Sequence, residues 1–102
     1  MLIISSHGGV PIRLTDERWS HITARHPEMR ELRGRVLETL SEPDMTQEGN
    51  FGELLAVREY PDLAIGRFVV VVYREAGPKD GFVLTAYVAG RISSRRNVLW
   101  KR

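Results

Sequence analysis

The amino-acid sequence predicts an α+β domain in which two N-terminal helices pack on a four- to five-stranded antiparallel sheet. Apolar residues recur with helical spacing between residues 16 and 40, and a nearly unbroken apolar run occupies residues 68–73. Segments rich in β-branched and aromatic residues, joined by short turn sequences, fill the second half of the chain. Helices on one side of such a sheet form an α+β architecture.

The chain is expected to begin with a strand or arm over residues 1–10. Residues 10–14 follow the turn at Gly8 and Gly9 and favour a short strand, with residues 1–4 beside it.

The first helix is expected to start at Thr15, whose hydroxyl can accept a hydrogen bond from the free amides of the first turn. Asp16 and Glu17 suit the positive end of the helix dipole. Pro27 disfavours helical geometry at His26, which is therefore the expected end.

A second helix is expected from about residue 29 to residue 40. Its apolar face follows spacings of three and four and comprises Met29, Leu32, Val36 and Leu40.

Four further strands are expected, over residues 44–48, 53–59, 67–74 and 82–87. The run FVVVVY at residues 68–73 indicates a central strand that is covered on both faces, with a helix on one of them. The connections between the strands are short enough for antiparallel hairpins.

Length and composition indicate one globular domain over residues 1–102, because 42% of the residues are hydrophobic and 27% are charged. No apolar run approaches the roughly 18 residues of a membrane span. We expect no membrane association and no secretory signal, since MLIISS lacks a basic leader and a long apolar stretch. A cytoplasmic location is the simplest expectation.

Positive charge is concentrated at the C-terminal end. Residues 91–102 contain no acidic residue. Such a cluster suits a polyanion such as RNA, although a solvated basic tail explains it equally well. Its cations are Arg91, Arg95, Arg96, Lys101 and Arg102.

The sequence contains no pattern for a metal or a nucleotide cofactor. It has no Cys, and its only histidines are His7, His21 and His26. The spacing of five between His21 and His26 does not align both rings on one helix face. Gly8 and Gly9 lack the Lys and Ser/Thr of a Walker motif, so we expect no cofactor.

The first helix carries two adjacent stripes of side chains. We expect the stripe with Trp19 to face the sheet, which leaves His26 at the helix end and His21 nearer the solvent. Neighbouring cations favour the neutral form of His21, which is the form of a general base. A capping or packing role stays open for each histidine. The stripes are Arg18, His21, Arg25 and Trp19, Ile22, His26.

Thr85 and Tyr87 alternate with apolar residues in LTAY, so both are expected on one strand face. With Arg67 and a helix imidazole, they could surround one phosphodiester and cleave RNA without a metal. Thr and Tyr are also good strand formers, and that interpretation stays open.

Several motifs resemble those of a known family. The chain contains LT-x-ER-W-x-HI-x-x-RHPEM, a second helix followed by PD, then VVVxY and LTAY. This order resembles the phage-associated domains of the barnase, EndoU, colicin and RelE-like nuclease superfamily, over residues 12–87. The resemblance implies an α+β fold, a metal-independent ribonuclease or toxin, and site positions at His26, Thr85 and Tyr87.

We therefore expect a toxin-like, metal-independent endoribonuclease. His26 or His21 is the expected acid/base group, and the RNA backbone is expected to contact Arg25, Arg67, Arg91, Arg95 and Arg96. One alternative is a non-catalytic RNA-binding or regulatory module. Another is the partner-binding half of a toxin-antitoxin complex.

In the toxin-antitoxin alternative, exposed Leu99 and Trp100 would dock the antitoxin, although pairing of a last strand explains these residues equally well. Unpaired sheet edges also make a homodimer an expected partner arrangement.

Overall fold

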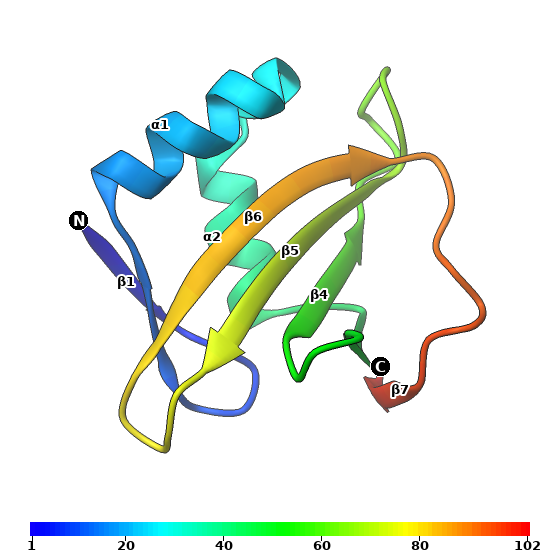
Figure 1. Cartoon of the computed structure of the whole chain (residues 1–102). Coiled ribbons are helices and arrows are strands. Elements are labelled where there is room, and N and C mark those ends of the chain that lie inside the picture. Colours follow the sequence, from blue (N-terminus) through cyan, green and yellow to red (C-terminus); the bar gives the residue numbers. More distant parts are fainter.

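A single mixed sheet of seven strands runs through the computed structural model, which describes all of residues 1–102 (Figure 1). The strand order is β1-β2-β6-β5-β4-β3-β7. In chain order the elements are β1 (Leu2–Ser5), β2 (Pro11–Leu14), α1 (Asp16–Arg25), the 3-10 helix η1 (Pro27–Glu31), α2 (Arg33–Ser41), β3 (Met45–Glu48), β4 (Leu54–Glu59), β5 (Phe68–Glu75), β6 (Gly81–Ala89) and β7 (Val98–Lys101).

The α+β class is confirmed, but the expected sheet was wrong in size and in pairing. Seven strands replace the expected four or five, and β2 pairs with β6 in parallel through Arg13 and Phe82. β2 and β6 are separated by both helices and three strands rather than by a tight turn, so nothing in the connection forces them to run antiparallel.

The helices are not at the N-terminus, because the antiparallel β1-β2 hairpin precedes them. The expected limits of α1 are confirmed: the Thr15 hydroxyl accepts from the Arg18 amide at 3.0 Å, and the helix ends at Arg25, two residues before Pro27. The second helix starts later than expected. Pro27 opens a 3-10 helix instead, and Leu32 separates this turn from α2.

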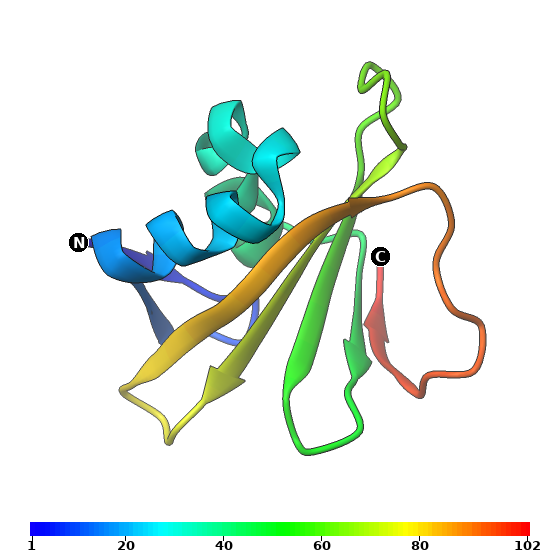
Figure 2. The same cartoon turned by 45° about the horizontal axis from the view of Figure 1, so that its top comes forward.

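Both helices lie on one face of the sheet, where the larger part of the core is formed (Figures 1 and 2). Val69 and Val71 of β5 are 0% exposed on this helix side, and Val70 is 2% exposed on the opposite face. The prediction of a central strand covered on both faces is therefore confirmed. The expected apolar face of the second helix is also in the core, with Met29, Val36 and Leu40 buried and Leu32 packed against them.

The C-terminal residues are not simply a basic tail. Residues 98–101 form β7, which pairs with β3. Trp100 is half-buried rather than exposed, because its ring stacks on His7 with the ring centroids 3.9 Å apart. Leu99 remains 50% exposed. The last-strand interpretation therefore accounts for Trp100.

None of the helices combines the length and apolar character that crossing a membrane would require.

Candidate functional site

A β-bulge determines which way the middle of β6 faces. Val72 of β5 pairs with Thr85, whereas the next residue, Tyr73, pairs with Val83, so Leu84 is an extra residue on β6. Side chains alternate along a regular strand, so without the bulge Val83 and Thr85 would share a face. With it, Val83 packs in the core under the helices while Thr85 turns to the other side.

Thr85 and Tyr87 consequently lie on the sheet face opposite the helices, which we call the open face. Tyr87 pairs with Val70 and Thr85 pairs with Val72. Both valines belong to the apolar cluster of the open face, which Tyr87 also contacts. The structure thus places the two polar side chains of LTAY on the same face.

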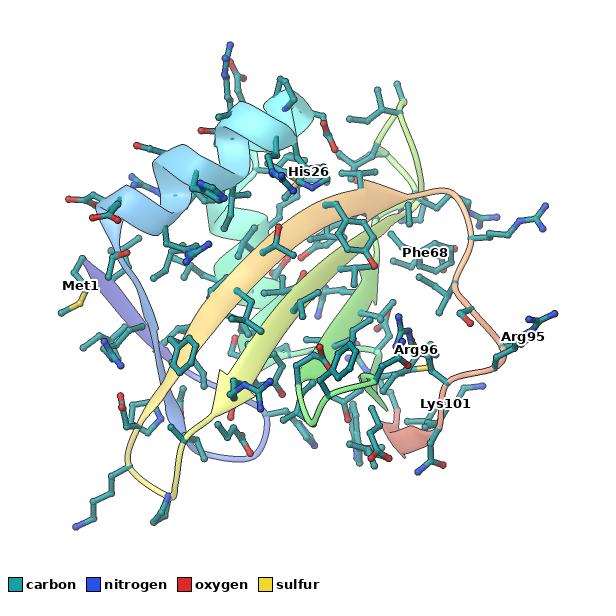
Figure 3. All side chains as sticks on the ribbon, viewed as in Figure 1. Met1, His26, Phe68, Arg95, Arg96 and Lys101 are labelled. Carbon is teal, nitrogen blue, oxygen red and sulfur yellow. The ribbon has the colours of Figure 1, made fainter.

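His26 lies where the end of α1 meets the edge of β6 (Figure 3). Its ring centroid is 5.9 Å from that of Tyr87. The Arg18 guanidinium donates to the Leu84 carbonyl at 3.4 Å, which ties the start of α1 to the bulge. The helix and the bulge therefore bring His26 to the border of the open face.

Glu28 is the nearest charged neighbour of His26. One carboxylate oxygen lies 3.7 Å from Nδ1 of the imidazole, and both side chains are about two-thirds buried, with 35% and 29% exposed. At this distance the carboxylate and the imidazole are in electrostatic contact without a hydrogen bond.

Tyr87 borders two adjoining hollows in the open face, of about 210 and 200 Å³. Both are lined by Leu55, Tyr87 and Arg96, and the larger one also by Arg91. The open face therefore combines an apolar floor, a phenol and two guanidinium groups, and His26 lies close to the phenol.

The loop between β6 and β7 carries these cations. The Gln47 side chain donates to the Ser93 carbonyl at 2.9 Å, and the Glu48 amide donates to the Asn97 carbonyl at 2.9 Å, so the loop is fixed to β3 at two points. Figure 3 shows Arg96 directed over the sheet and Arg95 directed away from it. Arg95 lines a separate polar hollow of about 410 Å³ next to Arg96.

Six of the predicted site residues line neither of the Tyr87 hollows: His21, Arg25, His26, Arg67, Thr85 and Arg95. His21 borders a hollow of about 400 Å³ with Thr15, Glu17 and Arg18. Arg67 forms a 2.7 Å ion pair with Glu59. Arg25 is exposed at the end of α1.

The structure therefore brings His26 close to Tyr87 and lines one hollow with Tyr87, Arg91 and Arg96, and Thr85 lies on the same face as Tyr87. It does not bring His21 or Arg67 to them.

Glu53 is the acidic group at the rim of the smaller hollow. Its pKa is lowered, mainly because the Phe51 amide donates to its carboxylate and also because Arg74 and Arg96 are near. Glu53 therefore stays ionised, and its carboxylate accepts the hydrogen bond from the Phe51 amide rather than forming a close ion pair with a loop cation. No group of three or more His, Cys, Asp or Glu side chains comes together anywhere in the chain.

The sequence-based predictions missed Glu28, Gln47 and Phe51. Glu28 had a signal, since it belongs to the RHPE motif, but its proximity to His26 depends on the 3-10 turn after Pro27. Phe51 stands between Asn50 and Gly52 in a turn, where a large apolar side chain is unusual. Gln47 gave no signal, because its role depends on a contact with a loop 46 positions away.

Comparisons of the chain with protein-family models, with curated proteins and with solved structures found no match.

Proposed function

We propose that this protein is a metal-independent endoribonuclease that cleaves RNA by acid/base transesterification. One observation carries the proposal: the ring centroids of His26 and Tyr87 lie 5.9 Å apart, and Tyr87 lines a hollow that Arg91 and Arg96 also line. An imidazole, a phenol and two cations are the groups that metal-free cleavage of a phosphodiester needs.

The reaction follows from these roles. His26 Nε2 removes the proton of a ribose 2′-hydroxyl, and the resulting oxygen attacks the adjacent phosphorus. A 2′,3′-cyclic phosphate forms as the bond from phosphorus to the 5′-oxygen breaks, and the Tyr87 hydroxyl protonates the leaving oxygen. Tyr87 then regains a proton from water, and His26 releases its proton.

The cations would stabilise the negative charge that grows on the phosphate oxygens. Arg96 extends over the open face, and Arg91 lines the larger hollow. Neither forms an ion pair with a carboxylate, so both charges are available to phosphate. Thr85 would orient the substrate from the same face.

The test is cleavage of RNA by the purified protein with EDTA present. His26→Ala and Tyr87→Phe should each reduce the rate by about 10²- to 10⁴-fold, which is the contribution of one general acid or base. His21→Ala is the matched control, because it also removes an imidazole from this part of the chain, but one that lines a hollow without Tyr87. Equal losses from His21→Ala and His26→Ala would contradict the assignment.

A second candidate is a non-catalytic RNA-binding or regulatory module. The observation in its favour is that no imidazole lines the Tyr87 hollows: His26 is in neither lining, and His21 lines a different hollow. RNA that stays intact but binds at low salt would support this candidate over the nuclease.

We place the activity in the cytoplasm and propose a toxin-like role. The N-terminal edge of the sheet supports a protein partner: β1 has a strand on one side only, and its Ile3 is 58% exposed. An antitoxin strand or a second copy of the chain would pair there. Size-exclusion chromatography with light scattering of the parent and Ile3→Lys proteins tests self-association. A dimer that persists in the variant would show that the β1 edge is not the dimer interface.

A further inference from the structure

The open face has three adjoining hollows with complementary chemistry. Two have an apolar floor that includes Leu55, and Tyr87 lines both. The third has no hydrophobic residue in its lining and contains Arg95. Arg96 lines all three, so it stands between the apolar floor and the polar hollow.

Phe51 extends this surface at the turn between β3 and β4. It lines the hollow shared by Tyr87 and Arg96, yet it is 81% exposed. The turn is not loose: the Phe51 amide donates to Glu53 at 2.7 Å, and Arg74 donates to the Phe51 carbonyl at 3.0 Å. The backbone therefore fixes an aromatic ring at the rim, where nothing in the chain covers it.

The cations beside this ring form no close ion pair, although Glu53 and Glu48 line the same hollows. Arg91, Arg95 and Arg96 form no ion pair with a carboxylate, and the nearest polar contact of Arg96 is Asn50 at 3.5 Å. A flat apolar surface next to free guanidinium groups complements a ligand that has a flat apolar part and an anionic part. An unstacked nucleotide has both.

We propose that these hollows bind one unpaired nucleotide of a single-stranded RNA. Its base lies on the apolar floor between Phe51 and Tyr87, and its phosphate contacts Arg95 and Arg96. A base inside a duplex is stacked on both faces and cannot enter, so the subsite selects single-stranded RNA. The inference rests on the proposed function in that the ligand is RNA, but it does not require that the chain cleaves it.

The experiment measures binding of a fluorescent 2′-O-methyl RNA oligonucleotide by anisotropy at low salt. Methylation blocks the attacking oxygen, so binding is observed without cleavage. The single strand should bind at least tenfold more tightly than the same oligonucleotide annealed to its complement. Phe51→Ala should weaken single-strand binding about fivefold or more, because loss of one base-aromatic stack has this order of effect.

Two control variants separate the subsite from general effects. Ile65→Ala removes another exposed apolar side chain, 62% exposed, that lines none of the hollows. Arg33→Gln removes an exposed cation at the start of α2, as the control for Arg96→Gln. Both controls should leave single-strand binding within about twofold of the parent, with an unchanged unfolding temperature in every variant showing that the fold is intact.

The outcomes distinguish the subsite from the nuclease. Equal affinity for single strand and duplex, or an unchanged affinity in Phe51→Ala, overturns the subsite even if unmethylated RNA is cleaved. A single-strand preference that depends on Phe51, together with intact unmethylated RNA, supports the subsite and overturns the nuclease. Absence of binding to either form overturns the subsite, and intact unmethylated RNA in addition overturns the nuclease.

Discussion

At the scale of single residues, the arrangement of His26 depends on Glu28. Pro27 opens the 3-10 turn that carries Glu28 back toward the imidazole, and the resulting separation of 3.7 Å is an electrostatic contact rather than a hydrogen bond. Under the proposed mechanism, Glu28 would favour hydrogen on Nδ1 of His26 and leave Nε2 as the proton acceptor, so we propose it as a positioning residue that acts through His26 and not through the RNA.

We expect Glu28→Gln to lower the cleavage rate less than His26→Ala does, on the order of tenfold, because the base remains but its tautomer is no longer favoured. The ¹⁵N chemical shifts of the His26 ring give a readout independent of activity. They should show hydrogen on Nδ1 in the parent and a mixture of tautomers in the variant. Glu31→Gln, in the same 3-10 helix, is the control. An unchanged ring spectrum in Glu28→Gln would remove Glu28 from this role.

Two buried tyrosines predict how stability depends on alkaline pH. Burial raises the pKa of Tyr73 to about 12, and burial together with the hydrogen bond to Glu38 raises that of Tyr60 to about 12, above the ordinary value of about 10. The native chain therefore holds protons that the unfolded chain has lost between pH 10 and 12. The free energy of unfolding should be unaffected by these groups below pH 10 and should fall as the pH rises through 12.

Urea unfolding at a series of pH values between 8 and 12 measures this dependence. Tyr73→Phe keeps the ring in the core and removes the ionisable hydroxyl, so its alkaline loss of stability should be smaller than that of the parent. Tyr87→Phe removes a phenol from the open face and should leave the alkaline profile as in the parent. Parallel profiles for Tyr73→Phe and the parent would show that Tyr73 does not cause the loss.

At the scale of elements, the junction of β2, β5 and β6 is built around Gly81. A Cβ at this position would lie 2.6 Å from the Arg74 carbonyl oxygen and 2.5 Å from the end of the Ile12 side chain. The carbonyl belongs to the neighbouring strand and cannot rotate away, so β6 approaches β5 and β2 closely only because residue 81 is glycine.

Gly81→Ala should therefore destabilise the protein by about 1–3 kcal/mol, as overpacking does. Gly34→Ala is the matched control: nothing lies within 4 Å of its Cβ, and the position is helical, so alanine should stabilise by roughly 0.5–1 kcal/mol. Chemical denaturation of both variants measures the change in the free energy of unfolding, which should fall for Gly81→Ala and rise for Gly34→Ala. A neutral effect at Gly81 would mean that the sheet junction adjusts without cost.

This junction also explains where sequence-based prediction ends. Local signals were sufficient for α1, because Thr15 and Pro27 act within a few residues, and for β5, whose run of valines is buried on both faces. The parallel pairing of β2 with β6 depends on contacts between distant parts of the chain, for which periodicity carries no information.

The candidate site shows the same division. The histidine and LTAY motifs could be located in the sequence, but period-two alternation alone would place Val83 on the same face as Thr85 and Tyr87, and the extra residue Leu84 in the bulge moves it to the helix side. The ion pair of Arg67 with Glu59 likewise depends on how the chain folds. The sequence alone therefore could not show that the positive charge of Arg67 is neutralised away from the candidate site.

At the scale of the whole molecule, the location of free charge matters more than its sum. The formal net charge is only +2, yet the segment over residues 91–102 has five cations and no acidic residue. Of these five, only Arg102 forms an ion pair, with Asp44 at 3.3 Å. The other four form no ion pair with a carboxylate: Arg91, Arg95 and Arg96 in the loop beside the open face, and Lys101 in β7.

RNA binding should report this distribution through its dependence on salt. Each phosphate neutralised on a single strand contributes a slope of about −0.7 to a plot of log affinity against log salt, so four free cations predict a total near −3. Arg95→Gln should make the slope shallower by about 0.7, because its charge is free to contact phosphate. Arg67→Gln also removes one positive charge, but Glu59 already neutralises it, so the slope should change much less. If both substitutions reduce the slope equally, RNA responds to the net charge of the molecule, and the loop over the open face is not its binding surface.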